Sequence, residues 1–271
     1  MCSSIGVLYK TSEAIAMLDM LISFAHVHMQ HIYVRPTFTD TLLVKQGRHP
    51  ILEAFFREPV VPNDIFANSA SNFQIITGPN MSGKSTYLRQ IALICIMSQI
   101  GSLVPAEYAS FRIINQLFSR VGSDDDIETN SSSFAVEMRE TAYIMHNVTE
   151  ESLVIIDELG RGTSTNDGIA IACAICDELL KKKPLVFCVT HFQEMISLLS
   201  SHPNVLNLNM QSTVGAPDSR HILQHSYTVR EGPNLAADYG IKLCKIAGFP
   251  EEILTRAREI SQEVDLILRP S

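Results

Sequence analysis

Runs of consecutive apolar residues recur along this chain and predict buried strands. Most are followed by a segment in which apolar residues recur every three or four positions, the spacing of a helix packed on one face. A strand that is apolar on both faces is typical of a parallel sheet covered by helices. The strands predicted from the sequence lie at residues 73–77, 117–121, 153–156, 185–190, 205–211 and 221–229. The sequence therefore predicts an α/β fold with a central, mostly parallel sheet.

Apolar residues at helical spacing predict helices in the segments around these strands. A first helix is indicated over residues 12–30, and Arg35-Pro36 would end it. No partner for this helix precedes it, so Met1 is expected to be the first residue of a fragment. Its apolar stripe consists of Ile15, Leu18, Ile22, Ala25 and Met29. Further helices are predicted after residue 84 up to Gly101, and over residues 134–148, 167–180, 235–247 and 251–268.

Between the strand at residues 73–77 and the helix after it, residues 78–85 match the pattern G-x-x-x-x-G-K-[ST] of a phosphate loop. Nucleotide phosphates need several converging backbone N–H donors, which a glycine-permitted turn at a helix N-terminus supplies. Lys84 would place a cation on the β- and γ-phosphate oxygens, and the Ser85 hydroxyl would ligate Mg²⁺. The predicted ATP-binding residues are Gly78, Pro79, Asn80, Met81, Ser82, Gly83, Lys84, Ser85 and Thr86.

Polar residues follow two of the predicted strands and indicate catalysis at one sheet edge. Asp157 and Glu158 end the run at residues 153–156, and His191 follows the run at 185–190. In doubly wound sheets, ligands bind at the carboxyl edge of the strands. We expect Asp157 to hold Mg²⁺ with Ser85, and Glu158 to orient and deprotonate the attacking water. The predicted catalytic residues are Glu158, His191, which could contact the γ-phosphate, and Lys84.

Three other segments admit a structural and a functional interpretation. Ser132 and Ser133 could cap the helix at 134–148 or form an anion-binding surface, and the sequence leaves both open. The acidic run at residues 124–128 is expected to be a solvated loop rather than a metal site. The two C-terminal helices suggest a DNA-reading helix-turn-helix, but the second lacks a basic face, which favours packing or dimer contact.

Composition narrows the class of protein. The chain has 271 residues, 46% of them hydrophobic, and a formal net charge of −8, which argues against a large nucleic-acid footprint within this segment. Its six cysteines follow no framework and favour a reducing compartment, with Cys173 and Cys176 in the core. No uncharged run reaches the ~20 apolar residues of a bilayer span, so we expect no membrane contact.

Together these residues resemble the MutS family of DNA mismatch-repair and recombination ATPases, which are of the ABC type. Residues 78–85 are similar to the family's phosphate loop, residues 157–165 to its Walker B segment and following loop, and residues 132–138 to its signature helix. Thr190-His191-Phe192 resembles its His switch. The resemblance implies a P-loop NTPase fold. It also implies an end of a lever domain at residues 1–35, an ATPase domain at 36–232 and a helical dimerisation segment at 233–271.

The resemblance also implies how the protein works. In ABC-type ATPases the signature helix contacts the γ-phosphate of the partner subunit, so Ser132 and Ser133 would complete the opposite site. Residues 33–41 and 124–132 look most like the branch of the family that acts in meiosis. The implied partner is a second MutS-type subunit, the fifth eukaryotic homologue, in a nuclear heterodimer that uses ATP and Mg²⁺. The pair would clamp double-stranded DNA or Holliday junctions through domains absent from this chain and promote crossovers.

Two departures from the family and three alternatives accompany this interpretation; one departure is Asn166, which replaces an aromatic residue usual in repair members. The family often stacks an aromatic residue on adenine from the loop at residues 58–63, where this chain has Val60. A mismatch-repair ATPase is an alternative within the family. A nucleotide-gated interaction module with incidental turnover is an alternative of another class, and the intact Glu158 favours the enzyme. A transporter-type ATPase is disfavoured because no Leu-Ser-Gly-Gly-Gln signature occurs.

Overall fold

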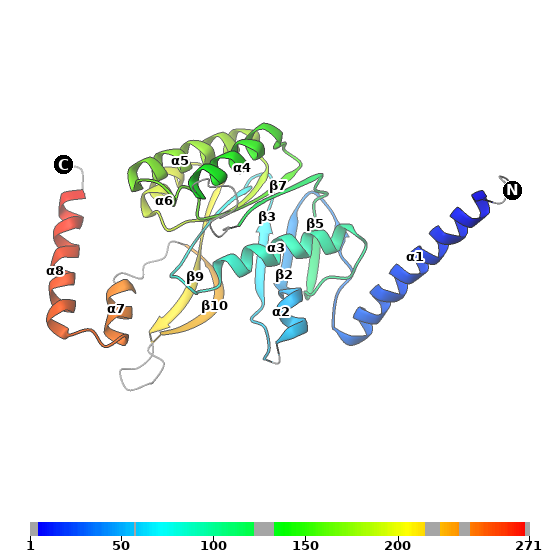
Figure 1. The fold of residues 1–271 in the computed structure, drawn as a ribbon, viewed down its shortest axis with the longest axis horizontal. Coiled ribbons are helices and arrows are strands. Elements are labelled where there is room, and N and C mark those ends of the chain that lie inside the picture. Colours follow the sequence, from blue (N-terminus) through cyan, green and yellow to red (C-terminus); the bar gives the residue numbers. More distant parts are fainter. Residues whose placement is uncertain (1–4, 57, 122–132, 215–222, 233–238, 269–271) are drawn as a thin grey trace.

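The α/β class predicted from the sequence is confirmed in a computed structural model, which describes residues 5–56, 58–121, 133–214, 223–232 and 239–268 (Figure 1). The first elements are α1 (Ile5–Gln30), β1 (Thr37–Phe38), β2 (Leu42–Gly47), α2 (Pro50–Phe55), β3 (Asn63–Ala67), β4 (Phe73–Thr77), α3 (Lys84–Gln99), β5 (Tyr108–Phe111) and β6 (Gln116–Arg120). They are followed by α4 (Ser133–Asn147), β7 (Ser152–Asp157), α5 (Thr165–Lys182), β8 (Leu185–Val189), α6 (Gln193–Leu199), β9 (Val205–Val214), β10 (Leu223–Glu231), α7 (Tyr239–Ile246) and α8 (Glu251–Leu268).

The central sheet has six strands in the order β10-β9-β4-β8-β7-β6. The five strands from β9 to β6 are parallel to their neighbours, and β10 is antiparallel to β9. Every residue of β4, β7 and β8 is buried, as their uninterrupted apolar sequences predict. Since these strands run in the same direction, their carboxyl ends meet at one edge of the sheet.

Helices cover both faces of this sheet. Adjacent residues of β4 point to opposite sides, so Ile75 packs in a core with residues of α4, α5 and α6, whereas Ile76 packs in a core with residues of α3. Figure 1 shows the same division of the helices into two layers. Cys176 is fully buried in the first core and Cys173 packs against it, as predicted from the sequence.

A second, four-stranded sheet in the order β1-β5-β2-β3 was not predicted as a sheet. It pairs β2 antiparallel to both β3 and β5, and β1 parallel to β5. Leu42, Val44 and Ile65 join it to the core on the α3 side. Its strands β1 and β5 have only two and four residues, too few to show a period. The short helices α2 and α6 were missed for the same reason.

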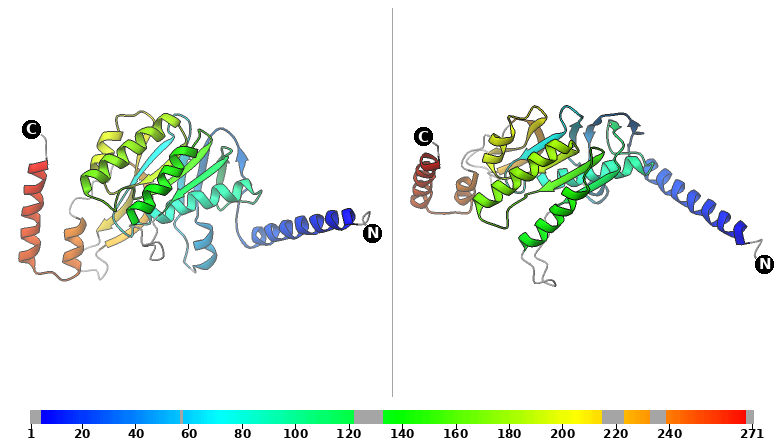
Figure 2. Two further views of the ribbon diagram at one scale, coloured as in Figure 1. Left: turned by 45° about the horizontal axis from the view of Figure 1, so that its top comes forward. Right: turned by 90° about the horizontal axis from the view of Figure 1, so that it is seen from above.

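Helix α1 begins earlier than predicted and contacts little of the chain. No described residue of α1 is buried, and both views in Figure 2 show it projecting from the body on the side opposite α7 and α8. Its apolar residues are not confined to the predicted stripe, because Val7 and Leu8, and likewise Leu21 and Ile22, are adjacent and all exposed. A helix that is apolar all round is typical of the interior of a larger assembly. None of the described helices combines the length and apolar content needed to cross a membrane.

The C-terminal helices α7 and α8 form a hairpin at the other end of the molecule (Figure 1). The turn between them includes Gly248, which has a φ of 82°, and the N–H of Phe249 bonds to the Cys244 carbonyl at 3.1 Å. Leu254 of α8 is buried. The role of this segment in dimerisation stays a prediction.

Candidate functional site

The predicted phosphate loop, residues 78–83, joins β4 to α3 at the carboxyl edge of the central sheet. Two of its glycines are required by their surroundings. Gly78 has a φ of 152°, and a Cβ there would lie 2.9 Å from the Met210 Cβ. Gly83 has a φ of 98° and precedes the first residue of α3. The backbone can therefore turn closely above the start of α3, where its N–H groups are available to an anion.

Lys84 lies inside this turn. Its Nζ donates to the carbonyl oxygens of Gly78 and Pro79, each at 2.9 Å, and the side chain is buried. Burial lowers the pKa of Lys84 below its usual range, and the nearby carboxylates of Glu158 and Asp157 oppose that shift. The ammonium therefore sits where a phosphate group could compete with the two carbonyls.

Ser85 and Asp157, the predicted Mg²⁺ ligands, lie together. The Ser85 hydroxyl donates a hydrogen bond to the Asp157 carboxylate, and burial raises the pKa of Asp157 more than this bond lowers it. Within the described residues, Asp157 Oδ1 and Ser82 Oγ are buried without a hydrogen-bond partner. A hydroxyl and one carboxylate fit Mg²⁺, which is usually bound through one or two carboxylates, substrate phosphates and water.

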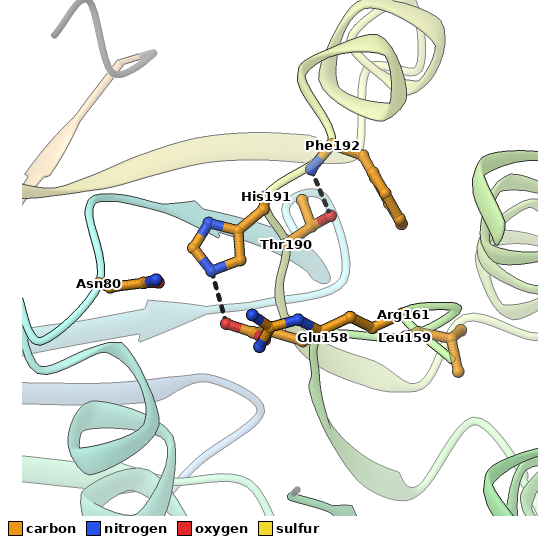
Figure 3. A pocket seen from close by; sticks show the side chains of 7 residues that line it. All are labelled: Asn80, Glu158, Leu159, Arg161, Thr190, His191 and Phe192. Atoms are coloured by element: carbon orange, nitrogen blue, oxygen red, sulfur yellow. Dashed lines mark hydrogen bonds and ion pairs between the residues drawn. The ribbon is translucent and has the colours of Figure 1, made fainter. Parts of the chain in front are cut away.

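Glu158 and His191 face each other across the ends of β7 and β8 (Figure 3). His191 Nε2 lies 2.6 Å from Glu158 Oε1, and Glu158 Oε2 forms an ion pair with Arg161. Glu158 has a φ of 56°, in the left-handed region, and its N–H donates to the Val189 carbonyl at 2.9 Å. Its backbone is thus tied to the neighbouring strand while its side chain points towards the site.

These side chains border a cavity of about 200 Å³, which Figure 3 shows from close by. Asn80, from the phosphate loop, reaches the cavity from the side opposite Arg161. The lining is polar where Glu158 and His191 meet, and apolar where Leu159 and Phe192 close it. The structure therefore brings residues from three predicted motifs to one cavity: the phosphate loop, the end of β7 and the end of β8.

Two predictions cannot be compared with this geometry. Ser132 and the acidic run at residues 124–128 lie outside the described residues. Ser133 is the first residue of α4. Whether it caps the helix or contacts an anion stays open, as in the sequence analysis.

Sequence reasoning gave no role to Glu137, which the structure brings against the loop after Glu158. Its Oε1 accepts a hydrogen bond from the Gly160 N–H at 2.6 Å, and the side chain is 5% exposed. A signal existed in the sequence. Glu137 falls three residues after Phe134 and seven before Ile144, which is the inward stripe of the predicted helix.

Tyr227 was also missed, and it lies beside the phosphate loop although it is distant in sequence. A Cβ on Gly83 would lie 3.1 Å from Tyr227 Cδ1. The residue has a φ of 54° within an irregular stretch of β10, where the register with β9 shifts. Asn63 holds this stretch: its amide donates to the Tyr227 carbonyl at 2.8 Å and accepts from the Val229 N–H at 2.7 Å. No local sequence pattern indicates this contact.

The comparisons with known proteins agree with the sequence motifs. The MutS domain V family matches residues 74–265. "MutS protein homolog 4" of Homo sapiens is 49% identical over 259 residues, which are 95% of this chain and 28% of the relative. "DNA mismatch repair protein MSH4" of Arabidopsis thaliana is 41% identical over 266 residues, 96% of this chain and 33% of the relative. "DNA mismatch repair protein MutS" of Thermotoga sp. is 43% identical over 257 residues, 94% and 31% respectively.

The chain thus spans about a third or less of the length of these relatives. The resemblance to the fourth eukaryotic homologue, which residues 33–41 and 124–132 suggested, is shown by the human and plant proteins. The family match covers more than half of the chain and includes the phosphate loop, Asp157, Glu158 and His191. The chain belongs to the MutS family.

Proposed function

We propose that this chain is the ATP-binding and ATP-hydrolysing part of a MutS-type DNA clamp. The observation that carries the proposal is the meeting of Lys84, the Ser85–Asp157 pair and the Glu158–His191 pair at one edge of the sheet. These residues come from β4–α3, β7 and β8, far apart in sequence. A cation, a set of oxygen ligands for Mg²⁺ and a candidate base are the parts that phosphoryl transfer to water requires.

Each of these residues has a task in the proposed reaction. Lys84 exchanges the carbonyls of Gly78 and Pro79 for phosphate oxygens when ATP binds. Ser85 and Asp157 would hold Mg²⁺, which would supply positive charge to neutralise the phosphates. Glu158 orients the attacking water and accepts its proton. His191 and Arg161 each engage one oxygen of Glu158, and because each carboxylate oxygen has two lone pairs, the side chain keeps acceptor sites for that water.

The base of ATP has a candidate contact in Tyr227. Val60 stands where the family often has a stacking aromatic, so the loop at residues 58–63 offers no ring at that position. Tyr227 is 46% exposed and lies beside Gly83, at the start of α3. An aromatic face that is partly open to solvent next to the phosphate loop is suited to stacking on a purine.

The wider role rests on the relatives. We propose a nuclear heterodimer with a second MutS-type subunit, the fifth eukaryotic homologue, that acts on Holliday junctions in meiotic recombination. The similarity to two proteins named as fourth homologues supports this role. A mismatch-repair ATPase remains the second candidate, because a bacterial mismatch-repair MutS is 43% identical. We further propose that ATP sits at a composite site, where Ser132 and Ser133 of each signature helix complete the opposite γ-phosphate shell.

Replacing Lys84 with Ala should weaken MgATP binding by at least about 100-fold, since hydrogen bonds to charged groups contribute ~1.5–3 kcal/mol each. Isothermal calorimetry on the purified chain measures this directly. Lys181→Ala, which removes an exposed lysine of α5, is the matched control and should bind normally. Near-normal affinity of the Lys84 variant would contradict the phosphate-loop assignment.

Replacing Tyr227 with Ala should weaken ATP binding by about 5- to 150-fold, because stacking of one base on an aromatic ring contributes ~1–3 kcal/mol. Binding of inorganic tripolyphosphate, which has no base, should not change. Tyr227→Phe keeps the ring and should bind ATP as the unmodified chain does. Equal weakening for both ligands would show that the residue supports the loop instead of the base.

Replacing Glu158 with Gln should preserve ATP binding and slow hydrolysis by about 10²–10⁴-fold, because the amide fits the site but cannot accept a proton. Single-turnover hydrolysis in the presence of the partner subunit measures the chemical step. A loss of less than tenfold would leave the nucleotide-gated interaction module as the better description.

Turnover per site should be low for this chain alone and should rise with partner concentration. Loss of one preorganised donor to a developing oxyanion costs ~10²–10³ in rate, so an incomplete site binds ATP but turns over slowly. The measurement is ATPase rate against protein concentration, with sedimentation to establish the oligomeric state. Fast, concentration-independent hydrolysis by a demonstrated monomer would exclude the composite site.

The meiotic and mismatch-repair roles separate by DNA substrate. In the full-length heterodimer, a Holliday junction should stimulate ATPase activity more than mismatched or linear duplexes of equal length. The same three substrates at two salt concentrations control for nonspecific phosphate contacts. Strongest stimulation by the mismatched duplex would favour the repair role.

A further inference from the structure

The loop that follows Glu158 is held by contacts from two helices. On one side, Glu137 of α4 accepts the Gly160 N–H at 2.6 Å, and a Cβ on Gly162 would lie 2.9 Å from the Phe134 Cβ. On the other side, a Cβ on Gly160 would lie 2.6 Å from the carbonyl oxygen of Gly168 in α5. The loop is therefore packed between the first turns of α4 and α5 with no room for side chains at its glycines.

Glu137 is an unusual residue for this position. It is 5% exposed and lies on the face of α4 that also carries Ile144, which is buried in the core. A buried carboxylate costs free energy unless hydrogen bonds satisfy it, so an apolar residue would be the ordinary choice for packing alone. The bond to a backbone N–H is charge-assisted, short and directional. A carboxylate here fixes a geometry that a leucine could not.

Two further polar contacts of α4 lie closer to its C-terminus than Glu137 does. Arg120 of β6 forms an ion pair with Glu140 at 3.0 Å, and Lys182 of α5 donates to the Met145 carbonyl at 2.6 Å. Glu137 lies about one helical turn from Ser133, the first residue of the helix. Its bond therefore ties the N-terminal end of α4, where the partner's γ-phosphate would bind, to the loop that carries the catalytic residues.

The backbone between Glu158 and Gly160 depends on such contacts. Both residues have positive φ, 56° and 83°, and Glu158 does so without being a glycine. Non-glycine residues hold this conformation only where the surroundings enforce it. If the Gly160 N–H lost its acceptor, the loop would have to shift to satisfy it. Such a shift would move the adjacent Glu158 and Arg161, which form the ion pair at the cavity.

We propose that Glu137 is a positioning residue that couples the two ATP sites of the dimer: its bond to Gly160 makes α4 and the loop after Glu158 move as one unit. A shift of α4 when it contacts the γ-phosphate at the partner's site then also moves Glu158 at this chain's own site. A shift of Glu158 likewise moves α4. The proposal rests on the proposed composite-site ATPase, and it adds the connection between the two sites.

The first experiment measures the effect at the chain's own site. In the full-length heterodimer, the partner's phosphate-loop lysine is replaced so that only this chain's site turns over. Glu137→Ala and Glu137→Asp should slow single-turnover hydrolysis about 10- to 100-fold with ATP affinity changed less than threefold, because a 1 Å misplacement of a catalytic group costs ~10²-fold in rate. Asp keeps the charge but is one methylene too short to reach Gly160. Glu137→Gln keeps the acceptor and should restore most of the rate.

Glu140→Ala is the matched control, because it removes a carboxylate from the same helix that pairs with Arg120 and does not reach the loop. It should hydrolyse ATP at the unmodified rate. Thermal unfolding of every variant, and hydrogen exchange of the peptide covering residues 158–163, separate positioning from general destabilisation. Faster exchange in the Ala and Asp variants, with recovery in Gln, is expected.

The second experiment measures coupling. With Lys84→Ala in this chain, only the partner's site turns over, and adding Glu137→Asp should still slow it at least fivefold. Unmodified hydrolysis rates for Glu137→Asp at both sites would overturn the proposal. It would also be overturned if the Ala, Asp and Gln variants all lost hydrolysis rate in proportion to a fall in their melting temperatures. If the Glu158→Gln variant still hydrolysed ATP at this chain's site, the proposed ATPase function itself would be contradicted. If Glu158→Gln silences that site while Glu137→Asp behaves like Glu140→Ala, only the coupling role falls.

Discussion

The parallel register of β4, β8 and β7 is the constraint on which the candidate site depends. Ile76 of β4 and Asp157 of β7 both pair with Val189 of β8, so the three strands end level with one another. The residues that follow, from Gly78, Glu158 and His191 onward, therefore emerge at the same edge. A register shift of one residue in any of the strands would turn its side chains to the other face and remove its contribution.

Backbone groups satisfy most of the polar side chains that the site buries. Lys84 donates to two carbonyls and Glu137 accepts from an N–H of the loop after β7. Because an unpaired buried polar group costs ~1–3 kcal/mol, these bonds define one conformation of each loop. Asp157 Oδ1 and Ser82 Oγ, which lack partners among the described residues, stand out against this background. Their presence beside Lys84 and Ser85 is consistent with a site built for ligands that carry charge.

Helices α1, α7 and α8 lie outside the two sheets and are the elements through which the site could contact other domains or subunits. Helix α1 exposes apolar side chains all round, and α7 and α8 lie at the other end of the body (Figure 2). Arg48, next to the start of α2, donates to the Ile32 carbonyl at 2.8 Å just after α1 and pairs with Glu53 at 3.0 Å. The chain therefore has a polar junction between α1 and the sheet that packs on α3.

The sequence by itself predicted the α/β class and the long helices, which the structure confirms, and it singled out the candidate phosphate loop, Asp157, Glu158 and His191, which the structure brings to one edge of the sheet. It could do so because apolar runs, helical spacing and a glycine pattern are local signals. The second sheet, the short helices α2 and α6, and the contacts of Glu137 and Tyr227 were decided only by the tertiary structure. Tyr227 lies against Gly83 because Asn63 and the pairing of β10 with β9 hold it there, and both Gly83 and Asn63 are more than 140 residues away from it in sequence. Such contacts depend on how elements pack together, and no spacing along the chain records that packing.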